Sequence, residues 1–498
     1  MTYRRMFDSA SVPELILATA RDPAIRVRPA LWAEGRALDY SALVDCITRV
    51  SGMLIARGLR RGERVALIAR RSVEAVAGVF GIMAAGGAAC VVDERLPPAE
   101  LGVRLRSAEI GWLLADAMHR ELAGAATGSK RVQLEDAARA TPRAIEDIGH
   151  GDDALLVMTS GSTGTPKAVL LTHGNLLSNA YGVAERTGVT PEDRLLHILP
   201  LHHTNGTNNL LIVPFGCGAS VVMLARFQAE TFFHEIATHH PTYVTGVATH
   251  YSRLLAHTPP PEALSSLRFL RSGAAPLGAQ LHREIERHLG LPLVHSYGLS
   301  EDTCTATMNP PAARRIGTVG TALAGQRVAV LEPGSEQTVP PGSEGEICIA
   351  GPSLMKGYVP PAVHRDGPSI RNGWLRTGDL GWLDGDGFLT VSGRLKEIII
   401  RGGENLSPGR IEEAILRNAT VRACCVVGAP DADLGEVPVA FVVAADGAAV
   451  RPEAVQDQVR AELPRACVPA RVVVLGALPE IGIGKIDRAA LRRLAAGA

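Results

Sequence analysis

Helical and strand-like patterns alternate along two stretches of the chain, and this alternation limits the possible folds more than any other feature. Between residues 40 and 115, a stretch with apolar residues three and four apart stops at Gly58 and precedes the strand-like run RVALIA. A second helical stretch and the run AACVV follow, and the same order returns between residues 195 and 300. Strands joined through helices form parallel sheets, so we predict an α/β fold with two doubly wound lobes.

The pattern changes beyond about residue 315, where short strands interrupted by Gly and Pro predict a small β unit. A compact α+β segment follows from residue 397. Its predicted elements are strands at 421–431, 437–444 and 470–475 and a helix near 452–463. The change in pattern places a boundary within SGRLKEIIIRGGEN, residues 392–405.

The charge balance excludes an electrostatic argument for nucleic acid or an anionic membrane as partner. Lys+Arg and Asp+Glu each number 51. No apolar run approaches the length of a transmembrane helix, and the N-terminal residues lack the apolar core of a signal peptide. The eight cysteines are scattered without a CxxC pair, which argues against a zinc cluster or a disulfide scaffold. We expect a cytoplasmic protein with reduced thiols.

Lysine is rare in this chain, and its positions are informative. It occurs only at Lys130, Lys167, Lys356, Lys396 and Lys485 among 51 basic residues. Codon bias explains the scarcity but not the positions. A chain that uses arginine almost everywhere is expected to keep lysine where a compact ammonium is needed.

The stretch TSGSTGTPK combines two glycines, five hydroxyl groups and a lysine directly after a strand-like run. Glycine lets backbone N–H groups approach an anion, and hydroxyls and an ammonium add donors, as a triphosphate requires. The spacing is not that of a Walker loop, because Ala168 follows Lys167. A solvated Ser/Gly/Thr linker is the alternative. The candidate phosphate-binding residues are Thr159, Ser160, Gly161, Ser162, Thr163, Gly164, Thr165 and Lys167.

Seven segments, in this order, resemble the adenylate-forming acyl-CoA synthetase superfamily. They are MTSGSTGTPKAV (158–169), PLHHTNG (200–206), SGAAP (272–276), SYGLSE (296–301), WLRTGDLG (374–381), GRLKEIIIRGGENLSPGRIEE (393–413) and GIGKIDR (482–488). The resemblance implies a carboxylic acid that attacks ATP to give acyl-AMP and pyrophosphate, and then a thiol that displaces AMP. ATP, Mg²⁺ and CoA are the implied cofactors and substrates.

The resemblance assigns the nucleotide and metal residues. Glu301 would ligate Mg²⁺, whereas by itself it could be an acid favoured at a helix N-terminus. Asp379 would accept both ribose hydroxyls, or be a turn residue beside Gly378, and Tyr297 would pack on adenine, or be a half-buried strand-end residue. The role of His295 stays open. The implied AMP-binding residues are Gly273, Ala274, Ala275, Tyr297, Gly298, Ser300, Asp379 and Arg394.

The resemblance also implies two roles for the C-terminal part. Lys485 would bridge the acid and the α-phosphate during adenylation, although Ile481 and Ile483 depart from the family's usual Thr and Ser before this lysine. Lys396 would be the hinge about which the C-terminal domain rotates, and Gly402, Gly403 and Glu404 would line a thiol tunnel, or form a tight turn before the next helix. The implied domains are 1–393 (AMP and acyl substrate), 394–396 (hinge) and 397–498 (mobile).

The identity of the acid is the least determined feature. His203 is implied to border the acyl pocket as part of the catalytic site, with Asn205 and Thr207. These polar neighbours would indicate a polar acid if they point inward and would be uninformative on a loop surface, where Asn and Thr are more often found. An α-amino acid is disfavoured, because Asn208 and Asn209 stand where an Asp would be needed.

Three alternatives stay open for the group that accepts the acyl moiety from the adenylate. An acyl- or aryl-CoA ligase is favoured over loading of a carrier protein and over capture of the adenylate by a nitrogen nucleophile. A catalytically silent nucleotide-binding protein is disfavoured, because Lys485, Glu301 and Asp379 are all present. The resemblance implies a monomer or a homodimer.

Overall fold

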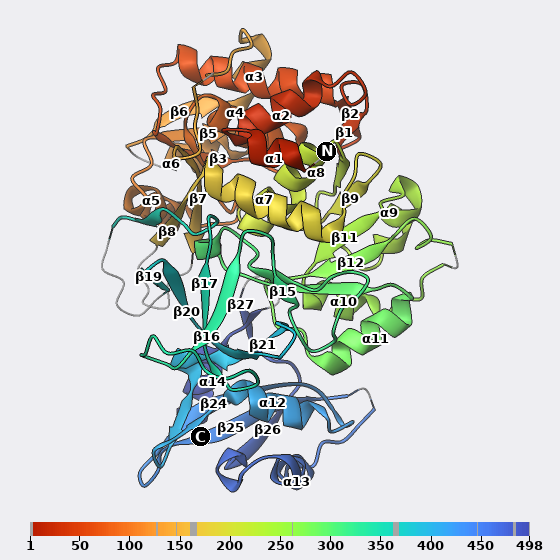
Figure 1. The fold of residues 1–498 in the computed structure, drawn as a ribbon, viewed down its shortest axis with the longest axis vertical. Helices are drawn as coiled ribbons and strands as arrows, with labels where there is room; N and C mark the ends of the chain where they lie inside the picture. The colour runs from red at the N-terminus through yellow and green to blue at the C-terminus, as the bar shows by residue number, and fades with distance from the viewer. Residues whose placement is uncertain are drawn as a thin grey trace.

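The computed structural model describes residues 3–125, 128–145, 147–159, 167–260, 262–361, 368–445, 447–481 and 485–497. A larger N-terminal part occupies the upper two thirds of Figure 1, and a smaller C-terminal part lies below it. No helix in these ranges has the length and apolar character that a membrane crossing needs.

The first sheet has seven strands in the order β18-β8-β7-β4-β3-β5-β6. Its neighbours β6, β5, β3, β4 and β7 run parallel, and β8 and β18 complete it in antiparallel fashion. The predicted strand runs RVALIA and AACVV are β3 and β4. The bounds are β3 (Arg64–Ile68), β4 (Ala88–Val91), β5 (Trp112–Ala115), β6 (Lys130–Gln133), β7 (Asp153–Thr159), β8 (Lys167–Thr172) and β18 (Gly357–Val359).

The second sheet has nine strands in the order β15-β14-β13-β12-β11-β9-β10-β1-β2, with a parallel centre from β13 to β1. Its bounds are β1 (Pro29–Ala33), β2 (Arg36–Asp39), β9 (Arg194–His197), β10 (Ser220–Met223), β11 (Tyr243–Gly246), β12 (Phe269–Ser272), β13 (Leu293–Tyr297), β14 (Thr307–Met308) and β15 (Thr321–Ala322). The two parallel sheets confirm the predicted α/β fold with two doubly wound lobes.

Helices join and cover these strands, and one large apolar core contains residues from both sheets. The helical bounds are α1 (Arg4–Asp8), α2 (Val12–Arg21), α3 (Tyr40–Ala56), α4 (Val73–Ala84), α5 (Pro98–Ser107), η1 (Ala117–His119), α6 (Arg120–Ala125), η2 (Leu134–Arg139), α7 (His173–Thr187), η3 (Asn205–Ile212), α8 (Val213–Cys217), α9 (Phe232–His239), α10 (Ala248–Leu254), α11 (Ala279–Leu289) and η4 (Ser300–Asp302).

Helix α7 crosses the molecule between β7 and β9 in Figure 1 and links the two lobes. Its start is fixed by a capping box, in which the Thr172 hydroxyl accepts from the Asn175 N–H and the Asn175 side chain accepts from the Thr172 N–H. Its end is fixed by Gly188 in the left-handed region, at φ 62°. Both ends are therefore set by local sequence.

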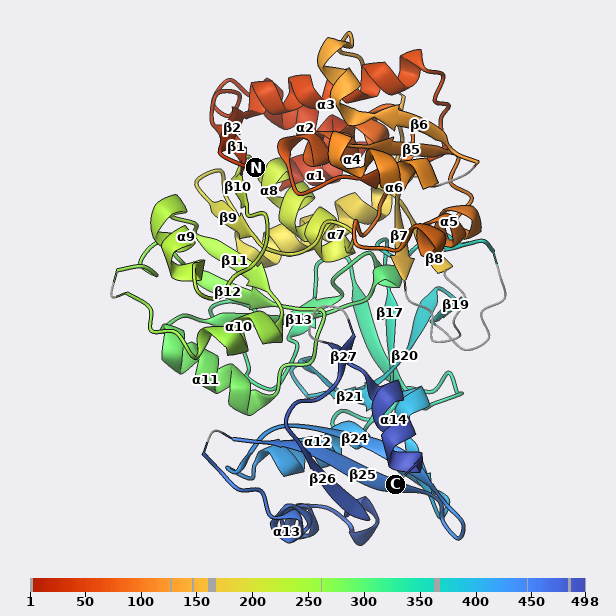
Figure 2. The same ribbon diagram turned by 180° about the vertical axis from the view of Figure 1, so that it is seen from behind.

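The predicted small β unit is a five-stranded antiparallel sheet, in which β21 pairs with β20 outside the order β16-β17-β20-β19. Its bounds are β16 (Arg327–Leu331), β17 (Gly345–Ala350), β19 (Ser369–Arg371), β20 (Trp374–Leu383) and β21 (Leu389–Arg394). This sheet lies between the large lobes and the C-terminal part in Figures 1 and 2.

The C-terminal part has its own sheet, in the order β23-β22-β25-β24 with β26 beside β25, and its own apolar cores. The short hairpin of β27 and β28 lies between this sheet and the large lobes along the vertical axis of Figure 2. The bounds are η5 (Leu395–Glu397), β22 (Ile399–Arg401), β23 (Glu404–Leu406), α12 (Pro408–Leu416), β24 (Val421–Asp431), β25 (Gly435–Ala444), α13 (Pro452–Glu462), η6 (Arg465–Cys467), β26 (Arg471–Leu475), β27 (Glu480–Ile481), β28 (Lys485–Ile486) and α14 (Arg488–Ala496).

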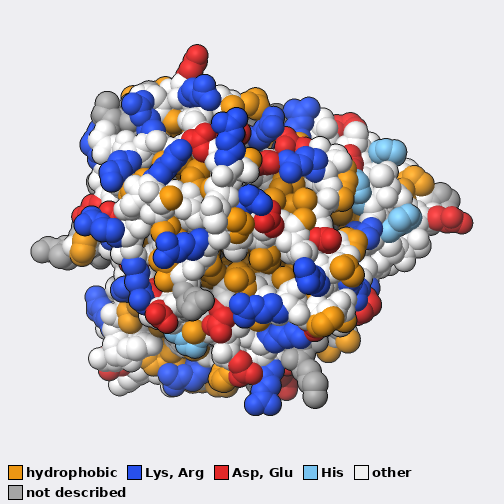
Figure 3. All heavy atoms as spheres, turned by 90° about the horizontal axis from the view of Figure 1, so that it is seen from above, with side chains coloured by type: hydrophobic (Ala, Val, Ile, Leu, Met, Phe, Trp, Pro, Cys, Tyr) orange, Lys and Arg blue, Asp and Glu red, His pale blue; other side chains and the backbone are white. Residues whose placement is uncertain are grey.

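Charges of both signs mingle on the face formed by the N-terminal lobe, which Figure 3 shows from above. Several of the basic side chains in this lobe have acidic partners, such as Arg57 with Asp136 and Arg61 with Asp152. This distribution agrees with the balanced composition and adds no argument for a polyanionic partner.

Candidate active site

Three predicted nucleotide-binding residues meet where β20, β21 and β13 converge. Asp379 of β20 lies opposite Arg394 of β21 in the strand register, and its Oδ1 is 3.0 Å from Arg394 Nε. The Tyr297 hydroxyl, at the end of β13, donates to Asp379 Oδ2 at 2.8 Å. Residues far apart in the sequence thus form one contact group around a single carboxylate.

Burial sets the electrostatics of this group. It raises the pKa of Asp379, and the charge of Arg394 opposes that effect. Burial and the nearby Asp379 raise the pKa of Tyr297 well above its usual range, so the hydroxyl stays protonated and donates. Each oxygen of Asp379 retains lone-pair capacity for further donors, which a pair of ribose hydroxyls could supply.

A second contact group surrounds Glu301, which is buried. Its Oε1 accepts from the Tyr358 hydroxyl at 2.7 Å and lies 3.7 Å from Lys167 Nζ. Lys167 Nζ also lies 4.1 Å from the centre of the Tyr358 ring. Burial and Glu301 raise the pKa of Tyr358, so the phenol remains a donor. Tyr358 is a residue that the sequence analysis missed.

The predicted phosphate loop connects two paired strands. Thr159 ends β7 and Lys167 begins β8, and the two residues are partners in the register, with Thr159 Oγ1 donating to the Lys167 carbonyl at 3.4 Å. Ser160, Gly161, Ser162, Thr163, Gly164 and Thr165 lie outside the described residues. The lysine of the motif therefore emerges at a hairpin end and points to Glu301.

The predicted adenine segments follow β12 and β13. Ala274 is exposed and has φ +64°, which is unusual for a residue other than glycine. Gly298 leaves no room for a side chain, because a Cβ there would come 2.2 Å from the Cys304 carbonyl oxygen. Ala275 and Ser300 lie nearby in sequence, the first directly after Ala274 and the second at the start of η4.

His295 is buried on β13, and its Nδ1 has no hydrogen-bond partner among the described residues. Burial, with the charge of His282, lowers the pKa of His295 to about 4, so the imidazole is neutral at pH 7. A neutral imidazole can both donate and accept, but its role at the adenine edge stays open.

The polar residues after His203 form a π-helix, η3, whose side chains are buried rather than exposed. The expectation that Asn and Thr here would more often lie on a surface is therefore wrong, because the fold encloses η3 between α7 and the sheet of β9. Asn205 and Asn209 join through a hydrogen bond of 3.0 Å, while the Thr207 hydroxyl donates to the Leu201 carbonyl at 2.8 Å. His203 itself is exposed, with its ring 4.4 Å from that of His202.

Lys396 lies in η5, directly after β21, and its side chain is exposed. Partial desolvation and the charge of Arg394 lower its pKa, with a smaller lowering from Lys167 and an opposite effect from Asp379. Lys396 is therefore within electrostatic reach of both contact groups described above.

The GGEN segment forms the turn between β22 and β23. Gly402 and Gly403 have φ values of 57° and 86°, and Glu404 begins β23. This is the tight turn that the alternative interpretation predicts, and the assignment of a thiol tunnel stays a prediction. Lys485 begins β28, whose partner is β27, and its side chain lies outside the described residues, as do Ile483 and Gly484.

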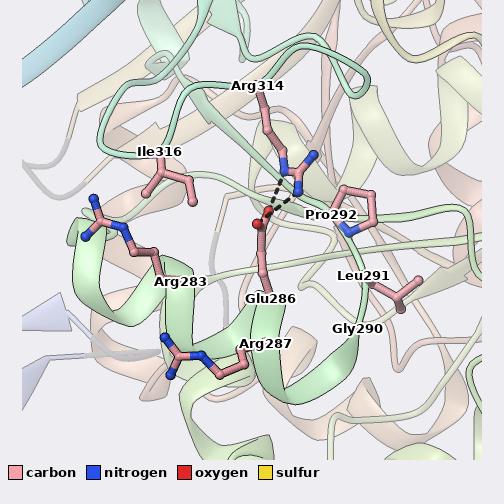
Figure 4. A pocket seen from close by; sticks show the side chains of 8 residues that line it. All are labelled: Arg283, Glu286, Arg287, Gly290, Leu291, Pro292, Arg314 and Ile316. Atoms are coloured by element: carbon pink, nitrogen blue, oxygen red, sulfur yellow. Dashed lines mark hydrogen bonds and ion pairs between the residues drawn. The ribbon is translucent and has the colours of Figure 1, made fainter.

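A surface hollow at the end of α11 lies apart from these groups, and none of the predicted site residues lines it. Figure 4 shows Arg314 reaching across it to Glu286, with Nη2 and Oε2 2.9 Å apart. Since the two charges compensate each other, we assign this hollow no part in the chemistry. Its lining residues are Arg283, Glu286, Arg287, Gly290, Leu291, Pro292, Arg314 and Ile316.

Comparison with known families matches most of the chain. A family model described as "AMP-binding enzyme" matches residues 20–359, and one described as "AMP-binding enzyme C-terminal domain" matches residues 410–485. These matches include the segments that carry Lys167, Glu301 and Tyr358.

Curated relatives and solved structures agree with these family matches. The chain is 35% identical to the sulfoacetate–CoA ligase of Cupriavidus necator, over 93% of this chain and 96% of that protein. It is 34% identical to a feruloyl-CoA synthase of Amycolatopsis, over 92% and 94%. The crystal structure of ATP-bound MatB from Rhodopseudomonas palustris superposes with a TM-score of 0.91 at 31% identity, over 97% of this chain and 98% of that one.

Proposed function

This chain belongs to the AMP-binding enzyme family and is an AMP-forming acid–thiol ligase, and from this premise we propose how its residues divide the reaction. A carboxylic acid attacks the α-phosphorus of ATP, which gives acyl-AMP and pyrophosphate. The thiol of CoA then attacks the acyl carbon, and AMP leaves. The protein must neutralise two anions in the first step and admit a thiol in the second.

One observation carries the residue assignments. Lys167, Glu301 and Asp379 come from three separate segments, and Arg394 and Lys396 come from a fourth, yet each acts electrostatically on another. Lys167 lies 3.7 Å from Glu301, the charge of Glu301 raises the pKa of Asp379, and Asp379 pairs with Arg394. The charge of Asp379 raises the pKa of Lys396, and the charge of Lys167 lowers it. A cluster of alternating charges suits a polyphosphate, its cation and a ribose.

We assign the residues as follows. Residues 159–167 hold the β- and γ-phosphates, Asp379 accepts the ribose hydroxyls, and Lys485 reaches the reacting oxygens of acid and α-phosphate. Tyr297 lies beside the base together with residues 273–275. The opposite charge of Arg394 favours the ionised form of the Asp379 carboxylate, which is the form that accepts both hydroxyls.

Mg²⁺ fits this site through a single protein ligand. The described residues contain no cluster of three or more His, Cys, Asp and Glu side chains that could hold a metal alone. A buried carboxylate, Glu301, with a phenol donor on the same oxygen suits a cation that takes most of its other ligands from phosphates and water. The metal would neutralise charge on the phosphates, and Tyr358 would orient the Glu301 carboxylate.

The domain division and its motion belong to this proposal. Residues 394–396 would be the hinge between the domains 1–393 and 397–498, and rotation about Lys396 would exchange Lys485 for the GGEN turn at the site. The position of η5 between β21 and β22 supports a hinge there. A cytoplasmic location is supported by eight free cysteines.

The test is a panel of carboxylic acids with ATP and Mg²⁺. Pyrophosphate release is measured with and without CoA, and AMP and the thioester are measured with CoA. We expect pyrophosphate release to depend on Mg²⁺, and AMP release to require CoA. A holo-carrier protein in place of CoA should not support AMP release. Turnover with the carrier protein but not with CoA would contradict the assignment of the thiol.

A further inference from the structure

Arg271 is a buried arginine that has no counter-charge among the residues that the structure describes. It lies on β12 and is 3% exposed, and burial lowers its pKa. Its Nη2 donates to Thr305 Oγ1 at 3.0 Å, while Nε has no hydrogen-bond partner among the described residues. Arg271 also forms no ion pair with any carboxylate of the described residues. A desolvated guanidinium is costly unless an anion or a full set of acceptors surrounds it.

Two other partly buried arginines show what a purely structural arginine looks like in this fold. Arg71 donates through Nε to the Leu224 carbonyl at 2.6 Å and through Nη2 to the His197 carbonyl at 2.8 Å, and it also binds the Leu199 carbonyl. Arg186 likewise binds the Met308, Thr321 and Ala322 carbonyls. Arg271 is more buried than either but donates to a single neutral acceptor within the described ranges, so its burial is not explained by backbone capping.

Polar, uncharged side chains lie on one side of Arg271, and two of them also have unused hydrogen-bonding atoms within the described residues. Asn209 Nδ2 lies 3.1 Å from Thr305 Oγ1 and 2.9 Å from Cys304 Sγ, while Asn209 Oδ1 has no partner in the described part of the chain. Thr245 is the register partner of Arg271 on β11, and its buried hydroxyl is also unpaired within the described residues.

This network is continuous with the proposed acid-binding side of the site. Asn209 donates to Asn205 Oδ1, and Asn205 Nδ2 lies 3.8 Å from the position of a Cβ at Gly273, two residues after Arg271. The groups whose charges affect the pKa of Arg271 are Cys304, Tyr243 and Tyr251, and none of them is a carboxylate. The guanidinium therefore lies on the side of η3, apart from Asp379 and Glu301.

We propose that Arg271 binds a second anionic group of the acid substrate, a carboxylate or a sulfonate that takes no part in the reaction. The ligase would then activate acids with two anionic groups in preference to acids with one. This inference rests on the proposed function, because it assigns the acid to the side of η3. A planar guanidinium with a free Nε matches the two oxygens of such a group, and the amides and hydroxyls of Asn205, Asn209, Thr245 and Thr305 would complete its hydrogen bonds.

The experiment compares acids matched in length that differ in the second anionic group. The pairs are malonate with propionate, succinate with butyrate, and sulfoacetate with propionate, each with ATP, Mg²⁺ and CoA. The kcat/KM for pyrophosphate release is measured for the wild-type protein and for Arg271→Met. The wild-type protein should prefer the dianionic member of at least one pair by ~100-fold or more, since the buried cation would otherwise be left unpaired. The malonate and sulfoacetate arms separate a carboxylate from a sulfonate.

Arg271→Met should lower kcat/KM for the preferred dianionic acid by ~100-fold and leave the monoacids unchanged or improved. Arg268→Met is the matched control, because Arg268 lies just before the same strand and already pairs with Asp193 at 2.8 Å. It should not change the ratio of the two acids. Thermal unfolding of each variant checks the fold.

Three results would overturn the inference. The first is a wild-type protein that prefers monoacids or does not discriminate, which needs no variant to be observed. The second is an Arg271→Met protein that loses activity equally toward both members of a pair. The third is a lack of pyrophosphate release with every acid, in which case the proposed function fails together with this inference. Turnover of monoacids alone would overturn the inference but leave the proposed function standing.

Discussion

The nucleotide side and the acid side of the site differ in whether their buried charges are paired. On the nucleotide side, Asp379 pairs with Arg394, and Glu301 lies near Lys167. On the acid side, the Thr305 hydroxyl is the only acceptor that the described residues offer to the Arg271 guanidinium. A ligand of the nucleotide side inserts into charges that already compensate one another, so its residues should act mainly on nucleotide and metal. A ligand of the acid side would supply the missing charge, so Arg271 should act mainly on the choice of acid.

The largest expected effect concerns Lys485, which would bring a positive charge to the nucleotide side during adenylation. Lys485→Ala should lower acid-dependent pyrophosphate release by about 1,000-fold, because it removes the cation at the developing charge. Conversion of added acyl-AMP to the thioester should change far less. The two half-reactions are assayed separately, with Lys130→Ala, a lysine over the Trp112 ring, as control. Normal pyrophosphate release by Lys485→Ala would remove its assigned role.

The next effect tests whether the nucleotide side acts on ATP rather than on the acid. Asp379→Asn should lower kcat/KM for ATP by about 100-fold, through the loss of a charged acceptor for the ribose. Unfolding free energy should change by less than about 1 kcal/mol, because Arg394 is 55% exposed and its ion pair is screened. Asp384→Asn, which breaks a surface pair with Arg315, is the control. An effect confined to the KM of the acid would reverse the comparison.

Stability separates the two kinds of arginine without any substrate. Arg71→Met should destabilise the fold by about 1–3 kcal/mol, because buried carbonyls lose their donor. Arg271→Met should be neutral or stabilising, since it removes an uncompensated buried charge. Urea denaturation of both variants measures the difference. A loss of several kcal/mol for Arg271→Met would indicate a structural arginine and weaken the contrast between the two sides.

A smaller effect concerns the phenol beside Glu301. Tyr358→Phe keeps the ring under Lys167 but removes the donor to Glu301, so the apparent Mg²⁺ affinity should fall about tenfold. The measurement is pyrophosphate release against Mg²⁺ concentration. Tyr40→Phe, which loses a buried hydroxyl bound to the Ala219 carbonyl, is the control. An unchanged Mg²⁺ dependence would separate Tyr358 from the metal.

The smallest effect tests the hinge. Lys396→Ala should slow thioester formation by about tenfold, an effect of about 1.4 kcal/mol, and should alter adenylation less. Stopped-flow measurements of pyrophosphate and of AMP release distinguish the two. If adenylation suffers more than thioester formation, Lys396 belongs to the nucleotide side and is not the hinge.

Much of this protein follows from its sequence alone. The alternation of apolar periods predicted the two parallel sheets, and the runs at 421–431, 452–463 and 470–475 predicted β24, α13 and β26. These predictions succeed because the spacing of apolar residues in a strand or helix can be read from consecutive residues. The order of seven short motifs likewise pointed to the family, since each motif is local in sequence.

Only the tertiary structure decided which side chains meet and which are buried. Asn205 and Asn209 looked like surface residues, because the sequence does not show that α7 and the sheet enclose η3. Tyr358 carries no motif of its own and reaches Glu301 only because β18 pairs with β8. Arg271 lies in a strand whose pattern gives no sign that its charge is uncompensated. Burial and charge pairing depend on residues brought together from distant parts of the chain, and local periodicity does not encode them.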